Sequence, residues 1–244
     1  MMEKINLEEK GNIDISSAWE SYWSKTSELS HPIYWDCNSE WSSRDLSRFK
    51  NTIDSQLPLI DFACGHGKQT RFLADHFTRV IGVDVSKSAV EMAKAQYNAP
   101  NIEYRVLDGL KPEQAKALHS EIGDANIYMK GGFHHIPVER RFEFAKSLQI
   151  LLGNQGIIYL IELGESATNY FNSLREKYGN FPEEMTIVLE HGIRPGTVAL
   201  QDIVNFFPEF EILQSGEDFF DVVFPLPDGE DSKIPMFYAT MKHK

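Results

Sequence analysis

The chain has 244 residues, of which 42% are apolar and 25% charged, as expected for a globular protein with one large core or two small ones. Its net charge of −12 argues against nucleic acid or an anionic membrane as the main partner, because both attract cationic surfaces. Two cysteines, Cys37 and Cys64, are too few to stabilise a chain of this length by disulfide bonds, so nothing indicates an oxidising compartment. We expect a cytoplasmic protein without a secretory signal or a membrane span, since no apolar run approaches about 18 residues.

The first fifty residues contain all four tryptophans and predict a helical, aromatic-rich segment (1–50). Trp19 and Trp23 are four residues apart and Tyr22 lies between them, so one helix can present all three. Such a face usually packs on the rest of the protein. It could also close over a cationic ligand, and Tyr22 and Trp35 are the lid candidates.

From residue 51 onward, short apolar runs alternate with helical patterns, which indicates βα units and a parallel sheet. Two later β-like runs, separated by the turn-rich Pro225–Lys233, predict an antiparallel pair at the sheet edge. The seven expected strands are Leu57–Ala63, Arg79–Val85, Ile102–Leu107, Ala125–Met129, Gly156–Leu163, Phe210–Gln214 and Met236–Met241.

The helix expected after the fourth strand has the clearest helical spacing. Pro137 suits its start, and five apolar residues share one face: Val138, Phe142, Ala145, Leu148 and Leu152. Residues 165–198 follow the fifth strand in a looser pattern, with helical pieces near 169–178 and 183–190, and another helix is expected to open at Thr197. We interpret 165–198 as a substrate lid within a domain spanning 51–244.

The most informative segment is an apolar strand that ends in an acid and enters a glycine turn before a helix. Gly65 and Gly67 allow a sharp turn and a close backbone approach to a ligand at the carboxyl end of a parallel strand. A dinucleotide site would need a third small residue where Thr70 stands. Asp61 would repel a pyrophosphate but attract a cationic ligand such as S-adenosylmethionine.

This segment resembles the first motif of the class I S-adenosylmethionine-dependent methyltransferases, matched by Asp61, Gly65 and Gly67, with Ala63 in place of a frequent glycine. The resemblance implies a Rossmann-like, doubly wound, mostly parallel seven-stranded α/β sheet with an antiparallel edge strand. It assigns Asp84, after the second strand, to the ribose hydroxyls, and Asp108 to the adenine amino group. The full set expected to bind the cofactor is Tyr22, Asp61, Ala63, Gly65, Gly67, Asp84, Val85, Asp108, Gly109 and Lys130.

The same resemblance places the segment after the fourth strand at the reaction centre. His134 and His135 are candidates for a general base, because imidazole accepts protons near neutral pH. Either could instead cap or orient the following helix. Glu162, at the end of the fifth strand, could accept a hydrogen bond from substrate, and His191 is a further candidate. Gly131, Gly132 and Phe133 stand where metal-assisted relatives hold ligands, so we expect no metal.

Several functions fit these residues, and the first is methyl transfer to a hydroxyl, amine or activated carbon of a small, apolar metabolite, either free or tethered to a carrier. Aromatic residues after the fifth strand support an apolar acceptor. They are Tyr170, Phe171, Tyr178, Phe181, Phe206 and Phe207. A non-catalytic module that binds S-adenosylmethionine is the alternative, and a nicotinamide-dependent oxidoreductase fits less well because of Asp61 and Thr70. An edge strand or the aromatic segment could also support a homodimer.

Overall fold

The computed structural model describes residues 14–26, 33 and 35–244, so residues 1–13, 27–32 and 34 of the expected N-terminal segment lie outside the described part. Two helices represent that segment, α1 (Ile15–Thr26) and α2 (Ser39–Phe49). The side chain of Asn38 caps α2 by accepting a hydrogen bond of 2.8 Å from the amide of Trp41. The helical character expected for the segment is confirmed for these residues.

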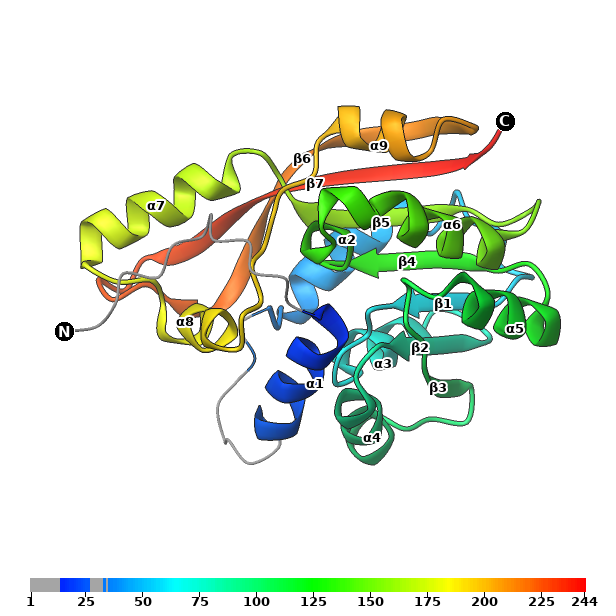
Figure 1. The fold of residues 1–244 in the computed structure, drawn as a ribbon, viewed down its shortest axis with the longest axis horizontal. Helices are drawn as coiled ribbons and strands as arrows, with labels where there is room; N and C mark the ends of the chain where they lie inside the picture. The colour runs from blue at the N-terminus through cyan, green and yellow to red at the C-terminus, as the bar shows by residue number, and fades with distance from the viewer. Residues whose placement is uncertain (1–13, 27–32, 34) are drawn as a thin grey trace.

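A seven-stranded sheet forms the centre of the molecule, in the order β3-β2-β1-β4-β5-β7-β6 (Figure 1). The first five strands are mutually parallel, and β7 runs antiparallel to both of its neighbours. This topology confirms the predicted Rossmann-like sheet with an antiparallel pair at one edge. The strands are β1 (Leu59–Phe62), β2 (Val80–Asp84), β3 (Ile102–Val106), β4 (Asn126–Lys130), β5 (Ile158–Leu163), β6 (Phe210–Pro225) and β7 (Asp231–His243).

Helices cover both faces of the sheet, which leaves the strand ends to hold the site. One face packs against α5 (Pro112–Ile122), α6 (Arg141–Leu152) and α9 (Leu200–Phe206). The other face packs against five helices. They are α2, α3 (Lys68–Ala74), α4 (Lys87–Gln96), α7 (Ala167–Tyr178) and α8 (Glu183–Glu190).

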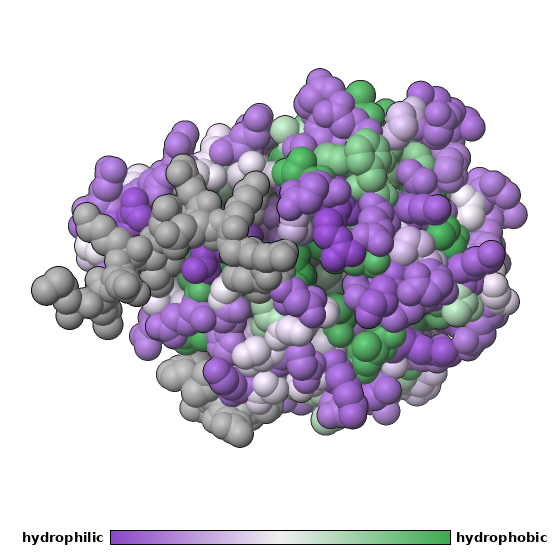
Figure 2. Space-filling model, in the orientation of Figure 1, coloured by the Kyte–Doolittle hydropathy of each residue, from purple (hydrophilic) through white to green (hydrophobic). Residues whose placement is uncertain are grey.

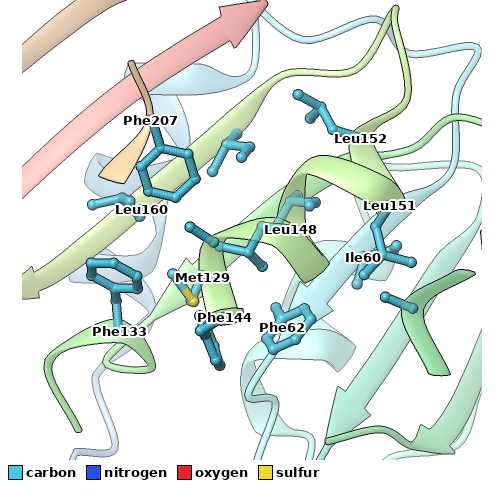
Figure 3. Close-up of a cluster of buried hydrophobic side chains, with 14 of the residues drawn as sticks. Ile60, Phe62, Met129, Phe133, Phe144, Leu148, Leu151, Leu152, Leu160 and Phe207 are labelled. Atoms are coloured by element: carbon cyan, nitrogen blue, oxygen red, sulfur yellow. The ribbon is translucent and has the colours of Figure 1, made fainter. Parts of the chain in front are cut away.

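The larger core lies between the sheet and α6. Figure 3 shows Phe62, Met129 and Leu160 of the strands pointing toward Phe144 and Leu148 of the helix. All five side chains are buried, and this burial fixes the strand ends relative to the loops that leave them.

The apolar face of α6 differs from the predicted one. The helix buries Phe144, Ala145, Leu148, Leu151 and Leu152. Val138 and Phe142 remain 50% and 61% exposed, because residues 138–140 form a separate 3₁₀ turn and the helix begins only at Arg141. The guanidinium of Arg141 is buried here and donates hydrogen bonds to the carbonyls of Ile136 and Thr197. A polar anchor therefore occupies the position where the pattern predicted an apolar contact.

The C-terminal hairpin is longer than predicted. Its strands extend over Phe210–Pro225 and Asp231–His243, so parts of the expected turn are paired backbone. Polar stretches such as residues 214–218 gave no strand pattern, but each strand supplies a partner for the other's amides. The far end of the hairpin extends beyond the parallel strands toward α7 (Figure 1). The last helix also begins at Leu200 rather than Thr197.

Hydrophilic residues dominate the face of the molecule drawn in Figure 2, and apolar residues appear there in small groups. Among the helices of the described residues, none combines the length and the apolar character that a membrane span requires.

Candidate functional site

A cavity of about 340 Å³ opens at the carboxyl ends of the parallel strands. The turn after β1, the ends of β2 to β4 and helices α1 and α8 all contribute to its walls. Its size lies within the range of small-molecule sites. Ligands of open α/β sheets collect at this edge, so the cavity is the candidate active site.

The glycine turn forms one wall of the cavity. Ala63 and Gly65 have positive φ angles of 61° and 54° and both line the cavity. A Cβ on Gly65 would lie 2.8 Å from the ring of Trp23, so helix α1 lies directly against the turn. Gly67 does not line the cavity; a Cβ there would meet the Tyr104 hydroxyl at 2.7 Å. Gly67 is therefore needed for the close packing of the turn against Tyr104, and not for the approach of a ligand.

Asp61 lies beneath the turn, fully buried, with its Oδ2 accepting a hydrogen bond of 2.5 Å from the Thr70 hydroxyl. Burial raises the pKa of this carboxyl to about 7. Thr70, the residue that departs from the dinucleotide pattern, therefore holds the Asp61 carboxyl in place. A cation in the cavity would favour the ionised form of Asp61.

Asp84 stands at the end of the neighbouring strand and also lines the cavity. Its two carboxylate oxygens accept hydrogen bonds from the amides of Gly65, at 2.8 Å, and Ser86, at 2.9 Å. Burial raises the pKa of Asp84 to about 6. Each oxygen keeps a second lone pair, so the carboxylate can still accept hydrogen bonds from a pair of hydroxyls.

Asp108 and Gly109 form the wall after β3. Oδ1 of Asp108 accepts a hydrogen bond of 2.9 Å from the amide of Leu110, and Oδ2 lies 3.2 Å from Nζ of Lys111. The Phe144 ring lies so close to Gly109 that a side chain at this position would overlap it. Val85 lines the same part of the cavity.

Lys130, at the end of β4, extends its ammonium group into the cavity wall. Nζ donates a hydrogen bond of 3.2 Å to the carbonyl of Trp35 and lies 3.5 Å from Sγ of Cys37. The rings of Trp41 and Phe220 lie 5.5 and 5.3 Å from it. These contacts place one cation at the junction between the glycine turn and the apolar part of the cavity.

Glu162 organises the turn after β4 from behind the cavity wall. Its carboxylate accepts hydrogen bonds from the amides of Gly132, Phe133 and His134 at 3.0–3.1 Å. Oε2 also lies 2.6 Å from Nδ1 of His134. Because all three amides are donors and the carboxylate only accepts, we assign the proton of this pair to Nδ1, which leaves the lone pair on Nε2. Burial raises the pKa of Glu162 to about 7 and lowers that of His134 to about 3.

Six aromatic rings contact one another edge to face, tilted or stacked along one wall of the cavity, and we call them the aromatic belt. In spatial order they are His66, Trp23, Trp35, Trp19, His135 and His134. Neighbouring ring centroids are 4.1–5.9 Å apart. The belt joins the glycine turn to the turn after β4, and its three tryptophans come from the N-terminal segment.

Contacts with distant parts of the chain hold helix α1 beside the cavity. The Glu20 carboxylate of α1 accepts hydrogen bonds from the hydroxyls of Ser86 and Ser88 and from the Ser88 amide, at 2.6–3.1 Å. This places a negative charge at the start of α4, where the helix dipole favours it. On the other side, the Ser21 hydroxyl lies 3.0 Å from Nδ1 of His191, just after α8.

The far part of the cavity is apolar, and we call it the acceptor chamber. It is lined by Phe171, Met185, Leu189, Phe220, Ile234 and Met236. Of the six aromatic residues expected to shape an acceptor pocket, only Phe171 lines the cavity, and Phe206 and Phe207 belong to the main core. The hairpin residues Phe220, Ile234 and Met236 were not predicted for the site.

Most residues predicted for the site converge on this cavity, but Gly67, Tyr22, Glu162 and the further candidate His191 do not line it. Tyr22 does not line the cavity. It is buried among Trp19, Trp23 and Trp35, in a cluster that also contains Val188 of α8. Glu162 has no exposed surface and contacts His134 instead of the cavity. Sequence reasoning missed His66 as a lining residue, and of the aromatic face considered for α1, Trp19 and Trp23 line the cavity in place of Tyr22.

His66 was missed although it stands inside the glycine motif, and that position was the signal that could have identified it. Its ring stacks on Trp23 at a centroid distance of 5.8 Å, and Nε2 lies 3.6 Å from a carboxylate oxygen of Asp36. Burial lowers the pKa of His66 to about 4, so the imidazole is neutral at pH 7. Within the described residues, no cluster of three or more His, Cys, Asp or Glu side chains has the arrangement of a metal site.

Comparisons with known proteins agree with this geometry. Residues 59–156 match the family model of a methyltransferase domain. The crystal structure of an S-adenosylmethionine-dependent methyltransferase from Anabaena variabilis is 55% identical, covers 99% of this chain and 100% of its own, and superimposes with a TM-score of 0.96. The chain therefore belongs to the class I S-adenosylmethionine-dependent methyltransferases, and S-adenosylmethionine is its cofactor.

More distant relatives are methyltransferases as well. N-demethylindolmycin N-methyltransferase of Streptomyces griseus is 35% identical over 63 residues, a match that spans 25% of this chain and 27% of that protein. The N-methyltransferase NodS of Bradyrhizobium japonicum, solved with S-adenosylhomocysteine, is 14% identical with a TM-score of 0.57 over 92% of this chain and 98% of its own. At that identity the likeness to NodS shows the fold alone.

Proposed function

We propose that this enzyme methylates a small, mainly apolar acceptor that occupies the acceptor chamber. One observation carries the proposal: a single cavity joins the glycine turn and the strand-end carboxylates to an apolar chamber beneath the lid. A donor site and an acceptor site that share one cavity can hold two reactants in contact. A metabolite tethered to a carrier would present the same apolar group to the chamber.

The residues present fit S-adenosylmethionine by their chemistry. A carboxylate with spare lone pairs, Asp84, suits the ribose hydroxyls, and Asp108 with Gly109 and Val85 suits the adenine end. Backbone with positive φ at Ala63 and Gly65 leaves room beside the turn. Asp61 supplies negative charge for a cationic ligand, and Lys130 supplies a cation for its carboxylate.

When bound, S-adenosylmethionine supplies a methyl group on a cationic sulfur. The protein's part is to align the acceptor, to exclude water and to receive a hydrogen bond from the acceptor. We assign that hydrogen bond to Nε2 of His134, because Glu162 holds the proton on Nδ1. The low pKa of His134 suits a hydrogen-bond acceptor better than a strong base. Glu162 is accordingly a positioning residue.

The lid and the belt exclude water from this cavity. Trp19 and Trp23 on α1, with Val188 and Leu189 on α8, line it from the side opposite the strand ends. Closure of such elements strengthens electrostatic interactions and prevents side reactions. Helix α1 belongs to the N-terminal segment 1–50 and α8 to residues 165–198, the two segments expected to act as lids.

Two measurements on the purified protein test this proposal. Calorimetry with S-adenosylhomocysteine should give one site per chain, and incubation with S-adenosylmethionine and a panel of small apolar alcohols, phenols, amines and acids should give a product heavier by one methylene group. A matched panel of polar sugars and peptides is the control. Turnover restricted to the polar panel would overturn the assignment of an apolar acceptor.

A further inference from the structure

The aromatic belt lines the part of the cavity where the glycine turn faces the turn after β4. Trp19 contacts His135 edge to face, with centroids 4.9 Å apart and an interplanar angle of 82°. Trp35 meets Trp19 at 83° and 5.6 Å, and meets Trp23 at 79° and 5.9 Å. Three indole rings in different orientations therefore line this cavity, and sets of aromatic rings bind methylated ammonium groups.

Charge in the rest of the cavity also favours a cation. Among the described lining residues, the carboxylates of Asp14, Asp36 and Asp61 accompany those at the ends of β2 and β3. The opposing cations are Lys68, Lys130 and Arg140, and Lys68 is already paired with Asp36 at 3.1 Å. The imidazoles of the belt add no positive charge at neutral pH, since burial lowers the pKa of each.

From this geometry we infer that the acceptor atom is the nitrogen of a neutral amine, and that the aromatic belt holds the alkylammonium product. The inference rests on the proposed function and narrows it from any apolar acceptor to an apolar amine. It assigns Trp19, Trp23 and Trp35 to the recognition of the acceptor's charge rather than to packing alone.

The chemistry of an amine acceptor balances without a strong base. The nitrogen lone pair forms the new N–C bond, and the electron pair of the breaking S–C bond stays on sulfur. The products are S-adenosylhomocysteine and a methylammonium ion, which later releases a proton to water when it carries one. Positive charge passes from sulfur to nitrogen and stays beside the belt throughout.

A hydroxyl acceptor would need different surroundings. Its proton must leave as the new bond forms, and the product is neutral, so an aromatic belt would stabilise the reactants more than the products. His134 and His135 are poor bases for that step because burial holds their pKa values low. Nε2 of His134 instead suits an N–H donor of a primary or secondary amine, whose lone pair it would orient toward the methyl group.

The decisive experiment compares two ligands of the same shape that differ in charge. We would titrate the protein, saturated with S-adenosylhomocysteine, with 3-hydroxyphenyltrimethylammonium and with 3-tert-butylphenol, using calorimetry. Because the bound product lacks the sulfonium methyl, the belt is free to contact the ligand. We expect the cation to bind about 10-fold more tightly than its neutral isostere. Equal affinities, or tighter binding of 3-tert-butylphenol, would overturn the inference.

Three variants connect the preference to the belt. Trp19→Leu removes one π face and should reduce the preference for the cation to less than about 3-fold, whereas Trp19→Phe should retain most of it. Phe142→Leu is the matched control, because Phe142 is exposed and lies outside the cavity. A preference that survives Trp19→Leu unchanged would contradict the assigned role of the belt.

This design separates the two proposals. Failure of S-adenosylhomocysteine to bind would remove the proposed function itself. Normal binding of S-adenosylhomocysteine without discrimination between the two isosteres would remove only the amine inference. As a second readout, matched pairs of arylalkyl amines and arylalkyl alcohols should give methylated amines and unmethylated alcohols; the reverse result would contradict the inference.

Discussion

Oε2 of Glu162 lies 2.6 Å from Nδ1 of His134, and the same carboxylate gathers three backbone amides of the turn that carries this histidine. One buried acid on β5 therefore fixes both the shape of the turn after β4 and the tautomer of the imidazole facing the cavity. We therefore expect function at this site to depend on Glu162, a residue that does not line the cavity.

The substitution Glu162→Gln tests that dependence. The glutamine amide places a donor where the carboxylate accepts, so the turn should lose about 1–3 kcal/mol of unfolding free energy. Misplacement of His134 should lower kcat about 100-fold. We expect the affinity for S-adenosylhomocysteine to change less than about 3-fold, because Glu162 does not line the cavity.

Urea unfolding, steady-state kinetics and calorimetry measure these three quantities. Glu143→Gln, at an exposed position on α6, is the control for the loss of a carboxylate. If Glu162→Gln kept full kcat at normal stability, Glu162 would not be a positioning residue.

Asp84→Asn should weaken the binding of S-adenosylhomocysteine about 10- to 100-fold, since one charged acceptor of hydrogen bonds is lost. The amide oxygen can still accept from Gly65 or Ser86, so the fold should survive. Calorimetry gives the affinity and the melting temperature verifies the fold. If the Asp84→Asn protein were folded and its affinity unchanged, Asp84 would not be the residue that binds the ribose.

Affinity for S-adenosylhomocysteine should rise with pH between about 5 and 7.5 and then level off. Burial raises the pKa of Asp61 to about 7 and that of Asp84 to about 6, so both carboxyls are partly protonated below neutrality in the free protein. The ligand's ammonium group favours the ionised form of Asp61, and binding therefore releases protons.

Titrations in buffers of different ionisation enthalpy count those protons. Thr70→Val removes the hydroxyl that lowers the pKa of Asp61 and should shift the rise in affinity to higher pH. A flat pH profile between 5 and 7.5 in both proteins would mean that Asp61 does not sense the ligand's charge.

Glu20→Gln should loosen the contact between α1 and the start of α4. Replacing the carboxylate weakens hydrogen bonds to Ser86 and Ser88 and removes a favourable interaction with the helix dipole, together about 1 kcal/mol. S-adenosylhomocysteine should then dissociate about five-fold faster, as stopped-flow tryptophan fluorescence can measure. An unchanged dissociation rate would indicate that α1 is not part of the lid.

Much of the fold followed from the sequence because hydrophobic period and glycine position act locally. The five parallel strands were predicted to within a few residues, for example Val80–Asp84 within the predicted 79–85. The hairpin was predicted too short, because its pairing is set by the facing strand and not by its own pattern. Three of the five residues predicted for the buried face of α6 are buried, whereas Val138 and Phe142 are exposed. The buried Arg141, which pairs with Asp202 at 3.2 Å, has no apolar signal that the pattern could use.

The position of a residue in the cavity wall was predictable where it depends on a place at a strand end, as for Asp61, Asp84 and Asp108. It was not predictable where the role depends on what packs behind the residue. The sequence could not show that Glu162 faces a turn instead of a ligand, or that Tyr22 points away from the cavity while Trp19 and Trp23 line it. Those outcomes depend on the rotation of elements about their own axes.

The most direct test of the account is a crystal structure of this protein with S-adenosylhomocysteine. We predict that the ribose hydroxyls hydrogen-bond to Asp84, that the adenine lies beside Asp108, and that the sulfur faces the aromatic belt toward the acceptor chamber. A complex in which S-adenosylhomocysteine lies outside this cavity, or with its sulfur turned away from Trp19 and His134, would contradict it.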